Sequence, residues 1–302
     1  MIDPRVLDSS DSACGKDGTR VGNGNNRTAR HPHDLIRNGC HTSGEVCMGR
    51  QWSWHLLLPI GVFLLAVLSE YSGLDLWLAD QVFDGGAQTW PFKNSYLARH
   101  IFHDMGRSMV LLLAVVNLLL LLASYFLQRL RPWRRHLWFV LIAAALGPAL
   151  VSLLKAYTHI YTPWDLQIFG GSRPYVRLFD PAPPGLPAGR AFPGGHSSGG
   201  FAFLSLYFLL AVYNHPWKWR ALLAIAALGS SFAAAQELRG AHLLSHDLVS
   251  LGICWSVSLL LALVFYREEI RKAAELSRMR QQSDVVVSRC KSSGMTATPR
   301  SA

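Results

Sequence analysis

Hydrophobic residues gather in six blocks along the chain, separated by polar segments. The blocks cover residues 54–72, 108–127, 137–154, 198–213, 221–236 and 248–266. Each block is about 16 to 20 residues long, which is close to the length that an α-helix needs to cross a bilayer. The pattern predicts an all-α polytopic membrane protein with six transmembrane helices.

The blocks differ in a way that predicts their surroundings. The second, Ser108–Leu127, contains no charged residue, so its membrane-spanning character is the clearest. The fifth is rich in Ala, Gly and Ser, which predicts close packing against neighbouring helices instead of exposure to lipid.

Composition narrows the class of protein further. Half of the 302 residues are hydrophobic and 16% are charged, whereas a soluble domain carries about 25% charged residues. Together with the block pattern, this excludes a disordered chain, a secreted disulfide scaffold and an ordinary soluble enzyme.

Residues 1–50 differ from the rest of the chain. The stretch Asp8–Arg30 consists mainly of Ser, Gly, Asp, Asn, Arg and Lys without apolar periodicity, which predicts disorder. It lacks the apolar core of a secretory signal peptide. Because Met48 directly precedes the first block, a translation start at Met48 is an open alternative. We therefore divide the chain into an N-terminal extension (1–50), a six-helix membrane domain (51–267) and a C-terminal tail (268–302).

Cations in the short connections predict the orientation. They lie between the second and third blocks, between the fourth and fifth, and after the sixth, at Arg129, Arg131, Arg134, Arg135, Lys218, Arg220, Arg267, Arg271, Lys272, Arg278 and Arg280. The positive-inside rule then places both termini in the cytoplasm and the 1–2, 3–4 and 5–6 connections outside, in the periplasm of a Gram-negative host. This topology accounts for the net charge of +10 without a nucleic-acid partner.

The cysteines agree with this orientation. Cys14, Cys40, Cys47 and Cys290 lie in the two terminal segments, and Cys254 lies inside the sixth block. Because the outward connections contain none and the chain has no Cys-x-x-Cys pattern, neither a disulfide framework nor a cysteine metal site is predicted.

Histidines and charged residues concentrate in the outward 3–4 and 5–6 connections. These residues are Lys155, Arg173, His196, Arg239, His242, His246 and Asp247. Ionisable groups near membrane depth are costly and indicate a functional site.

Five of the positions in these connections suit a bound phosphate. Lys155, Arg173 and Arg239 supply positive charge and directional donors. Gly194 and Gly195 directly precede a predicted helix, so their backbone N–H groups can point at an anion. The sequence therefore predicts a site that binds an anion and requires neither a metal nor a cofactor.

Two histidines from separate connections add reactive groups to this site. One of His196 and His242 can attack phosphorus while the other protonates the leaving oxygen. Asp247, five residues after His242, can fix the tautomer of that imidazole. The set contains the parts for phosphoryl transfer through a phosphohistidine.

Residues 52–266 resemble the type 2 phosphatidic acid phosphatase (PAP2) superfamily of membrane phosphatases, whose motifs are K-x6-RP, PSGH and SR-x5-H-x3-D. Pro193-Gly-Gly-His196 stands where PSGH would stand, and Gly240-Ala-His242 where the family has Gly-x-His. The resemblance implies a six-helix core with an outward site. It makes His242 the nucleophile, His196 the general acid and Lys155 a phosphate ligand.

The chain departs from these motifs at several positions. Thr162-Pro163 stands where the first motif has Arg-Pro, so the first arginine is absent there, and Arg173-Pro174 is a possible substitute farther along. Gln236 stands where the third motif has arginine, with Arg239 nearby. His246 occupies the position of the family acid, and Asp247 follows it. His246 is therefore an alternative nucleophile, although the Gly-x-His match favours His242.

Other interpretations of the same residues remain open. His242 and His246 have the i, i+4 spacing of a metal-dependent hydrolase, and Ser197 or Ser198 with His242 would suit an intramembrane serine protease. A lipid phosphotransferase and a non-catalytic lipid-phosphate binder or transporter also fit the location. The retained pair of His196 and His242 favours an enzyme over a binder. The amphipathic segment 99–107 is a further candidate for substrate contact.

The resulting hypothesis is a phosphatase of the bacterial inner membrane that acts on a lipid phosphate or pyrophosphate at the periplasmic face. An amphiphile suits a site at the membrane interface. Lipid A phosphates, undecaprenyl pyrophosphate, phosphatidylglycerophosphate and phosphatidic acid all have the required chemistry, and the sequence does not rank them.

Overall fold

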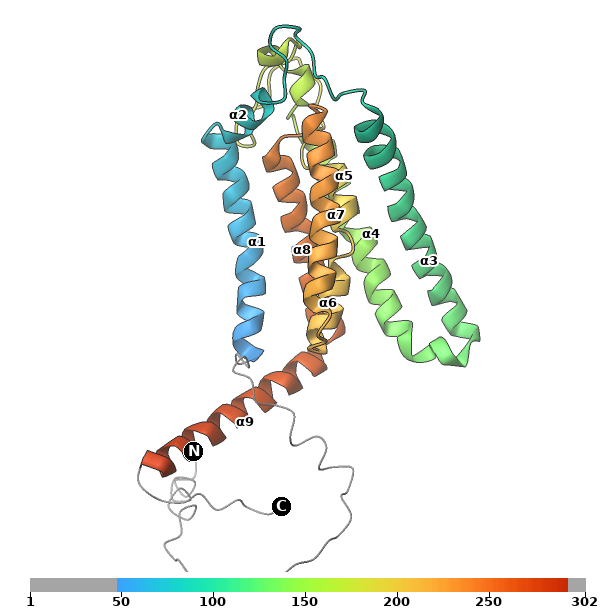
Figure 1. The fold of residues 1–302 in the computed structure, drawn as a ribbon, viewed down its shortest axis with the longest axis vertical. Coiled ribbons are helices and arrows are strands. Elements are labelled where there is room, and N and C mark those ends of the chain that lie inside the picture. Colours follow the sequence, from blue (N-terminus) through green and yellow to red (C-terminus); the bar gives the residue numbers. More distant parts are fainter. Residues whose placement is uncertain (1–47, 293–302) are drawn as a thin grey trace, which may run out of the picture. The chain divides into compact units, whose positions relative to one another are not determined.

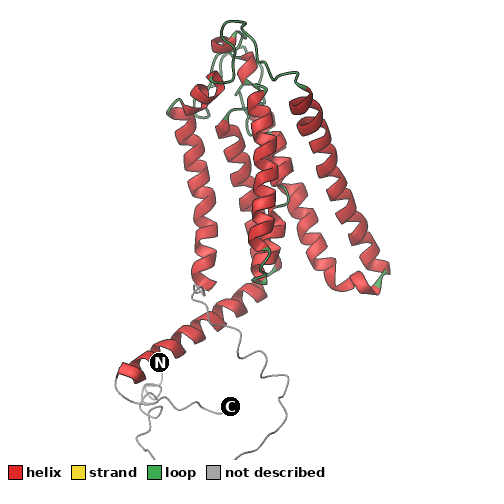
Figure 2. Ribbon diagram, viewed as in Figure 1, coloured by secondary structure: helices red, strands yellow, loops and turns green. Residues whose placement is uncertain are grey.

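The computed structural model describes residues 48–292, and every regular element in that range is helical (Figures 1 and 2). The predictions for residues 1–47, including disorder, the start at Met48 and the placement of Cys14, Cys40 and Cys47, lie outside the described residues, as does the end of the tail. The chain divides into a compact unit, Trp52–Ile270, and a second unit formed by the two terminal segments.

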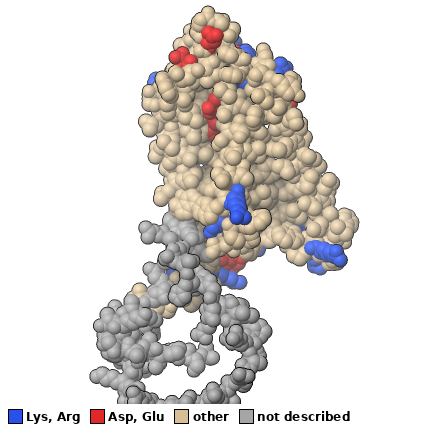
Figure 3. Space-filling model, viewed as in Figure 1, with Lys and Arg blue, Asp and Glu red and all other residues tan. Residues whose placement is uncertain are grey.

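Six helical stretches are long and apolar enough to cross a membrane, which confirms the predicted number. They are Trp54–Tyr71, Leu97–Phe126, Gln128–Tyr157, Gly195–Val212, Lys218–Leu238 and Leu244–Phe265. The chain is therefore a multi-pass, all-α membrane protein. In the view of Figure 3, the middle of the helical unit is largely free of charged side chains, as a lipid-facing surface requires.

The helices that build these spans follow one another along the chain. They are α1 (Met48–Tyr71), α2 (Leu74–Asp80), the π-helical η4 (Leu97–Met105), α3 (Gly106–Phe126), the 3-10 helix η5 (Gln128–Trp133), α4 (Arg134–Tyr157), the short η6 (Pro163–Asp165) and η7 (Gln167–Phe169), α5 (Gly195–Phe201), α6 (Leu204–Val212), α7 (Lys218–Leu238), α8 (Leu244–Phe265) and α9 (Arg267–Ser292).

Three elements differ from the predicted pattern. The fourth span is divided into α5 and α6 at Ala202 and Phe203. The second span begins earlier, because η4 continues directly into α3 and takes up the amphipathic segment 99–107. The tail is helical in α9, where a polar sequence with many good helix formers needs no membrane to support it.

Aromatic side chains form the core of the membrane unit and attach α1 to it. Phe139, Phe208 and Trp255 belong to one buried cluster contributed by α4, α6 and α8. His55 on α1 shares a 2.8 Å hydrogen bond with the Tyr207 hydroxyl, and its carbonyl oxygen accepts a bond from the Trp255 indole N–H. These two bonds give the buried polar groups of His55, Tyr207 and Trp255 partners inside the bundle, as the low dielectric demands.

Glycines let α5 and α7 approach each other closely. A Cβ on Gly200 would lie 2.6 Å from the Cα of Gly229, and a Cβ on Gly229 would overlap the Phe201 ring. This contact confirms the close packing predicted from the small residues of the fifth block. The prediction that this block is not exposed to lipid is wrong, because only 33% of the span Lys218–Leu238 is buried. The glycine contact holds the start of α5 beside the end of α7.

The three outward connections pack together at one end of the helices (Figure 1). Trp90 from the first, Tyr161 and Phe169 from the second, and Leu243 from the third share a hydrophobic cluster. Gly240 has a φ of 72°, and a Cβ there would overlap the Trp90 ring, so glycine is required on both grounds. This cluster fixes the chain that leads directly into His242.

Candidate active site

His242 and Asp247 form the central pair of the site. His242 lies in the connection between α7 and α8, and Asp247 lies in the first turn of α8. The Nδ1 of His242 lies 3.1 Å from Oδ1 of Asp247, and the two side chains are 7% and 3% exposed. A carboxylate at Nδ1 holds the proton there and leaves Nε2 as the basic, nucleophilic nitrogen.

Ser197 on α5 donates a second hydrogen bond to the same carboxylate oxygen. Its hydroxyl lies 2.6 Å from Oδ1 of Asp247 and is completely buried. Ser198 instead donates to the carbonyl oxygen of Gly195. The arrangement differs from that of a serine protease, because the Ser197 hydroxyl points at the acid and the described bond of His242 is also to the acid.

Glycine is required at position 194 because neighbouring side chains lie very close to its backbone. The prediction that the Gly194 N–H binds an anion is wrong. The N–H donates to the carbonyl oxygen of His246 at 2.9 Å, so it is already used inside the protein. A Cβ at this position would overlap Oδ1 of Asp247 and lie 2.7 Å from Oγ of Ser197 and 2.8 Å from Nδ1 of His242. The serine of the PSGH motif would not fit here.

Lys155 lies on the other side of the start of α5. It belongs to the last turn of α4, and a Cβ on Gly195 would lie 3.7 Å from its Nζ. Lys155 is also close enough to Asp247 and His246 to interact with both electrostatically. The structure therefore brings Lys155, Gly195 and the His242–Asp247 pair together.

His246 lies beside this group in a closed environment. Its side chain is 0% exposed, and its ring packs edge-on against Phe192 with the centroids 5.3 Å apart. Its described polar contact is with the backbone of Ala191. Within the residues that the structure describes, no three His, Cys, Asp or Glu side chains form a group that could hold a metal.

The two predicted arginines lie at the rim of this group. Arg173 is placed over the Tyr161 ring, and its backbone pairs with Asp165 and Gln167; its described contacts do not include His242. Arg239 donates from Nε to the carbonyl oxygen of Lys93 and from Nη1 to Oε1 of Gln236.

Gln236 thus takes the place of the motif arginine and positions another arginine three residues later. Partial burial lowers the pKa of Arg239, and the neighbouring charge of Arg99 lowers it further. Two cations facing each other at this rim favour the approach of an anion.

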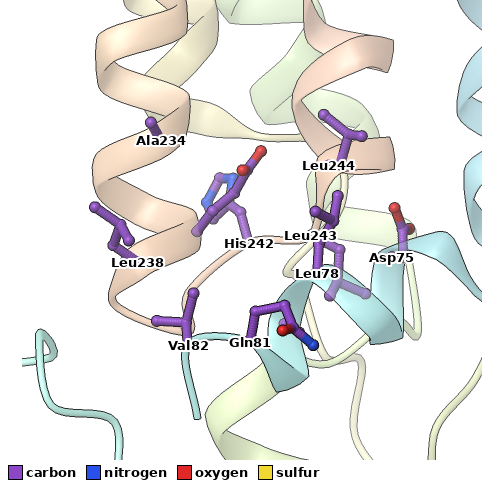
Figure 4. A pocket seen from close by; sticks show the side chains of 11 residues that line it. Asp75, Leu78, Gln81, Val82, Ala234, Leu238, His242, Leu243 and Leu244 are labelled. Atoms are coloured by element: carbon purple, nitrogen blue, oxygen red, sulfur yellow. The ribbon is translucent and has the colours of Figure 1, made fainter.

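A pocket of about 270 Å³ opens beside His242 between α2, α7 and α8 (Figure 4). We call it the His242 pocket. Its lining residues combine apolar side chains with two acids, and they are Asp75, Leu78, Ala79, Gln81, Val82, Ala234, Glu237, Leu238, His242, Leu243 and Leu244. His242 therefore borders open space, whereas His246 does not.

The two acids of the His242 pocket were not predicted from the sequence. Glu237 interacts with the Asp247 carboxyl group. Its position directly after the apolar block 221–236 could have marked it as a candidate. Asp75 accepts hydrogen bonds from the Ser69 hydroxyl at 2.6 Å and from the Ser245 N–H at 3.1 Å. Burial raises the pKa of Asp75. No local pattern linked this acid to the 5–6 connection.

A second pocket, of about 290 Å³, lies between α3, α5 and α7. It is lined by Arg107, Val110, Gly195, His196, Gly199 and Phe232, and we call it the Arg107 pocket. His196 is half-buried there. The two predicted histidines therefore border different pockets, His242 the one between α2, α7 and α8 and His196 the one between α3, α5 and α7.

The family comparison covers the part of the chain that contains this site. Residues 136–270 match the family model described as the PAP2 superfamily. No curated protein and no solved structure matches the chain.

Proposed function

We propose that the chain hydrolyses a lipid phosphate or pyrophosphate through a phosphohistidine at His242, because residues 136–270 match the model of the PAP2 superfamily and members of that superfamily are phosphatases. The observation that carries the proposal is the buried Ser197–Asp247–His242 arrangement next to Lys155.

The reaction proceeds in two steps at one phosphorus atom. Nε2 of His242 attacks phosphorus, the bond from phosphorus to the leaving oxygen breaks, and His196 gives a proton to that oxygen. Water then attacks the phosphohistidine, His196 takes a proton from it, and inorganic phosphate leaves with His242 restored. Asp247 stabilises the positive charge that His242 carries in between.

Positive charge near the start of α5 would stabilise the phosphoryl oxygens in the transition state. Lys155 lies beside Gly195 and interacts electrostatically with Asp247, so it is the first candidate for this role. The N–H of Gly195 can add a donor, and Arg239 acts from the rim. Arg173 stays a weaker proposal, because its described contacts are with Tyr161 and the neighbouring backbone.

The location favours an amphiphilic substrate. The site lies where α4, α5, α7 and α8 meet the outward connections, so a phosphate at the interface can reach it while its tails stay in the bilayer. The cations of the 2–3 and 4–5 connections and of the tail favour a periplasmic site with both termini in the cytoplasm of a bacterial inner membrane.

Phosphate release by the purified protein in detergent tests the proposal. Wild type, His242→Asn, His246→Asn and the control His159→Asn are compared on phosphatidic acid and on farnesyl phosphate, with EDTA present. We expect release by wild type, His159→Asn and folded His246→Asn, and a loss of about 1,000-fold or more in His242→Asn.

Other outcomes would contradict specific parts of the proposal. Activity that survives in His242→Asn but not in His246→Asn would make His246 the nucleophile. Activity that EDTA abolishes would indicate a metal-dependent hydrolase. Release only after an acceptor lipid is added would indicate a phosphotransferase, and binding without turnover would indicate a binder.

A further inference from the structure

The Arg107 pocket places a cation next to the histidine that would protonate the leaving group. Three helices contribute to it: α3 with Arg107 and Val110, α5 with His196, and α7 with Phe232. Except for Arg107 and His196, its lining is apolar or glycine. Arg107 is exposed in the first turn of α3, so its guanidinium group is available to an anion that enters this pocket.

The register between α3 and α5 determines which residues share a level in this pocket. A Cβ on Gly199 would lie 3.9 Å from both methyl groups of Val110, so these two residues face each other. Arg107 and His196 each precede this contact by three residues, nearly one helical turn. They therefore lie at the same level, one turn closer to the outward connections.

Packing of the first turn of α3 supports this placement. A Cβ on Gly106 would lie 2.7 Å from two ring carbons of Phe232, so the absence of a side chain lets α3 approach α7 closely. Arg107 directly follows this contact. Its backbone position is therefore fixed by helix packing and not by a loose surface turn.

Cations thus flank the start of α5 from two helices. Lys155 lies beside Gly195 from α4, and Arg107 borders the same glycine and His196 from α3. A phosphoryl group attacked by His242 would use Lys155. The leaving oxygen must lie near His196, on the Arg107 side. A neutral alcohol offers an arginine little to bind there, whereas a phosphate offers a charge-assisted, bidentate partner.

We propose, on the basis of the function proposed above, that the Arg107 pocket binds the proximal phosphate of an amphiphilic diphosphate and makes the enzyme selective for the anhydride bond. Nε2 of His242 bonds to the distal phosphorus, the anhydride P–O bond breaks, and the bridging oxygen takes its electron pair and a proton from His196. A lipid monophosphate leaves, and water releases inorganic phosphate from His242. Val110 and Phe232 contact the first part of the lipid chain.

The test compares two substrates that differ by one phosphate. Initial rates of phosphate release are measured with farnesyl diphosphate and with farnesyl monophosphate, for wild type, Arg107→Gln and Arg107→Lys. The control is Arg129→Gln, which removes an exposed arginine at the other end of α3. We expect Arg107→Gln to lower kcat/KM for the diphosphate roughly 10- to 100-fold and that for the monophosphate less than about threefold. Arg107→Lys should keep part of the preference for the diphosphate over the monophosphate, and Arg129→Gln should keep all of it.

The monophosphate rate separates the two proposals. If Arg107→Gln lowers kcat/KM equally for both substrates, or changes it for neither, the proposed selectivity is overturned. Hydrolysis of the monophosphate by wild type would still support the proposed function. If wild type releases phosphate from neither substrate, the proposed function fails and this inference fails with it. A further outcome would contradict a role confined to the leaving group: Arg107→Gln lowers kcat/KM for both substrates, and Arg107→Lys restores both values in full.

Discussion

The Asp247 carboxylate is stabilised at one oxygen by two donors from different parts of the chain. Ser197 on α5 and His242 before α8 both bond to Oδ1. A buried carboxylate is costly without such partners, so each donor contributes to stability and to the orientation of the His242 ring. The same oxygen atom therefore contributes to the stability of the fold and to the orientation of the proposed nucleophile.

Replacing Ser197 by Ala should weaken both properties. We expect the free energy of unfolding to fall by about 2 kcal/mol, because a buried hydrogen bond to a charged group is lost. We expect kcat to fall about tenfold, since the His242 ring is held less firmly. Thermal unfolding and phosphate release on the same preparation check this; Ser198→Ala, which loses a bond only to the Gly195 carbonyl oxygen, is the matched control. Unchanged kcat in Ser197→Ala would contradict the positioning role.

Restoring the family residue with Gly194→Ser should be harmful instead of neutral. The added Cβ would meet Asp247, Ser197 and His242. Overpacking of this kind costs about 1 to 3 kcal/mol, and displacement of the catalytic pair costs about 100-fold in rate. Gly61→Ala is the control, because a Cβ there meets nothing within 4 Å. A fully active Gly194→Ser protein would show that the pair can shift aside.

At the scale of elements, α2 connects the end of α1 with the start of α8. Asp75 makes the link through Ser69 and Ser245. Its pKa is raised by burial, so the protonated form favours the folded state. That contribution is complete below the unfolded value of about 4 and is lost as the pH rises through the folded value.

Asp75→Asn should remove this part of the pH dependence. The free energy of unfolding of wild type should decrease relative to that of Asp75→Asn as the pH rises above about 4. Unfolding in mixed detergent between pH 4 and 8 measures the difference, with the exposed Asp80→Asn as control. Parallel profiles for wild type and Asp75→Asn would contradict the raised pKa.

Elements were predicted well where one physical requirement dominates. Spans follow from the length of apolar blocks, so all six were found, and small residues predicted the close contact at Gly229. The division between α5 and α6 and the inward placement of Asp75 depend on tertiary packing, which no local pattern contains. For the same reason, the residue type alone made Arg173 and Arg239 candidates for phosphate binding. The described partner of Arg173 is an aromatic ring, and those of Arg239 are a backbone carbonyl and a side-chain amide oxygen.

In the whole molecule, the 1–2, 3–4 and 5–6 connections cluster at one end of the helices, as the sequence-based topology requires. This clustering is the same for either orientation in the membrane. Trp90, Tyr161 and Leu243 come from three separate connections and share one cluster. The orientation therefore still depends on the distribution of Lys and Arg, which reflects insertion and not packing.

Cysteine labelling tests the orientation. With the native cysteines replaced, Ala182→Cys in the 3–4 connection should react with a membrane-impermeant maleimide in spheroplasts. Arg129→Cys in the 2–3 connection should react only after permeabilisation; both positions are exposed. The reverse labelling would place the site in the cytoplasm and overturn the periplasmic proposal while leaving the chemistry intact.

The contact between Gly194 and Asp247 also restricts how such a chain can diverge. Asp247, five residues after His242, occupies the space that a Cβ at position 194 would need, whereas the PAP2 motifs have serine at that position and an acid four residues after the histidine. A lineage that moves from one arrangement to the other must change both positions together or pass through an inactive ancestor. We therefore expect the identities at these two positions to covary among relatives.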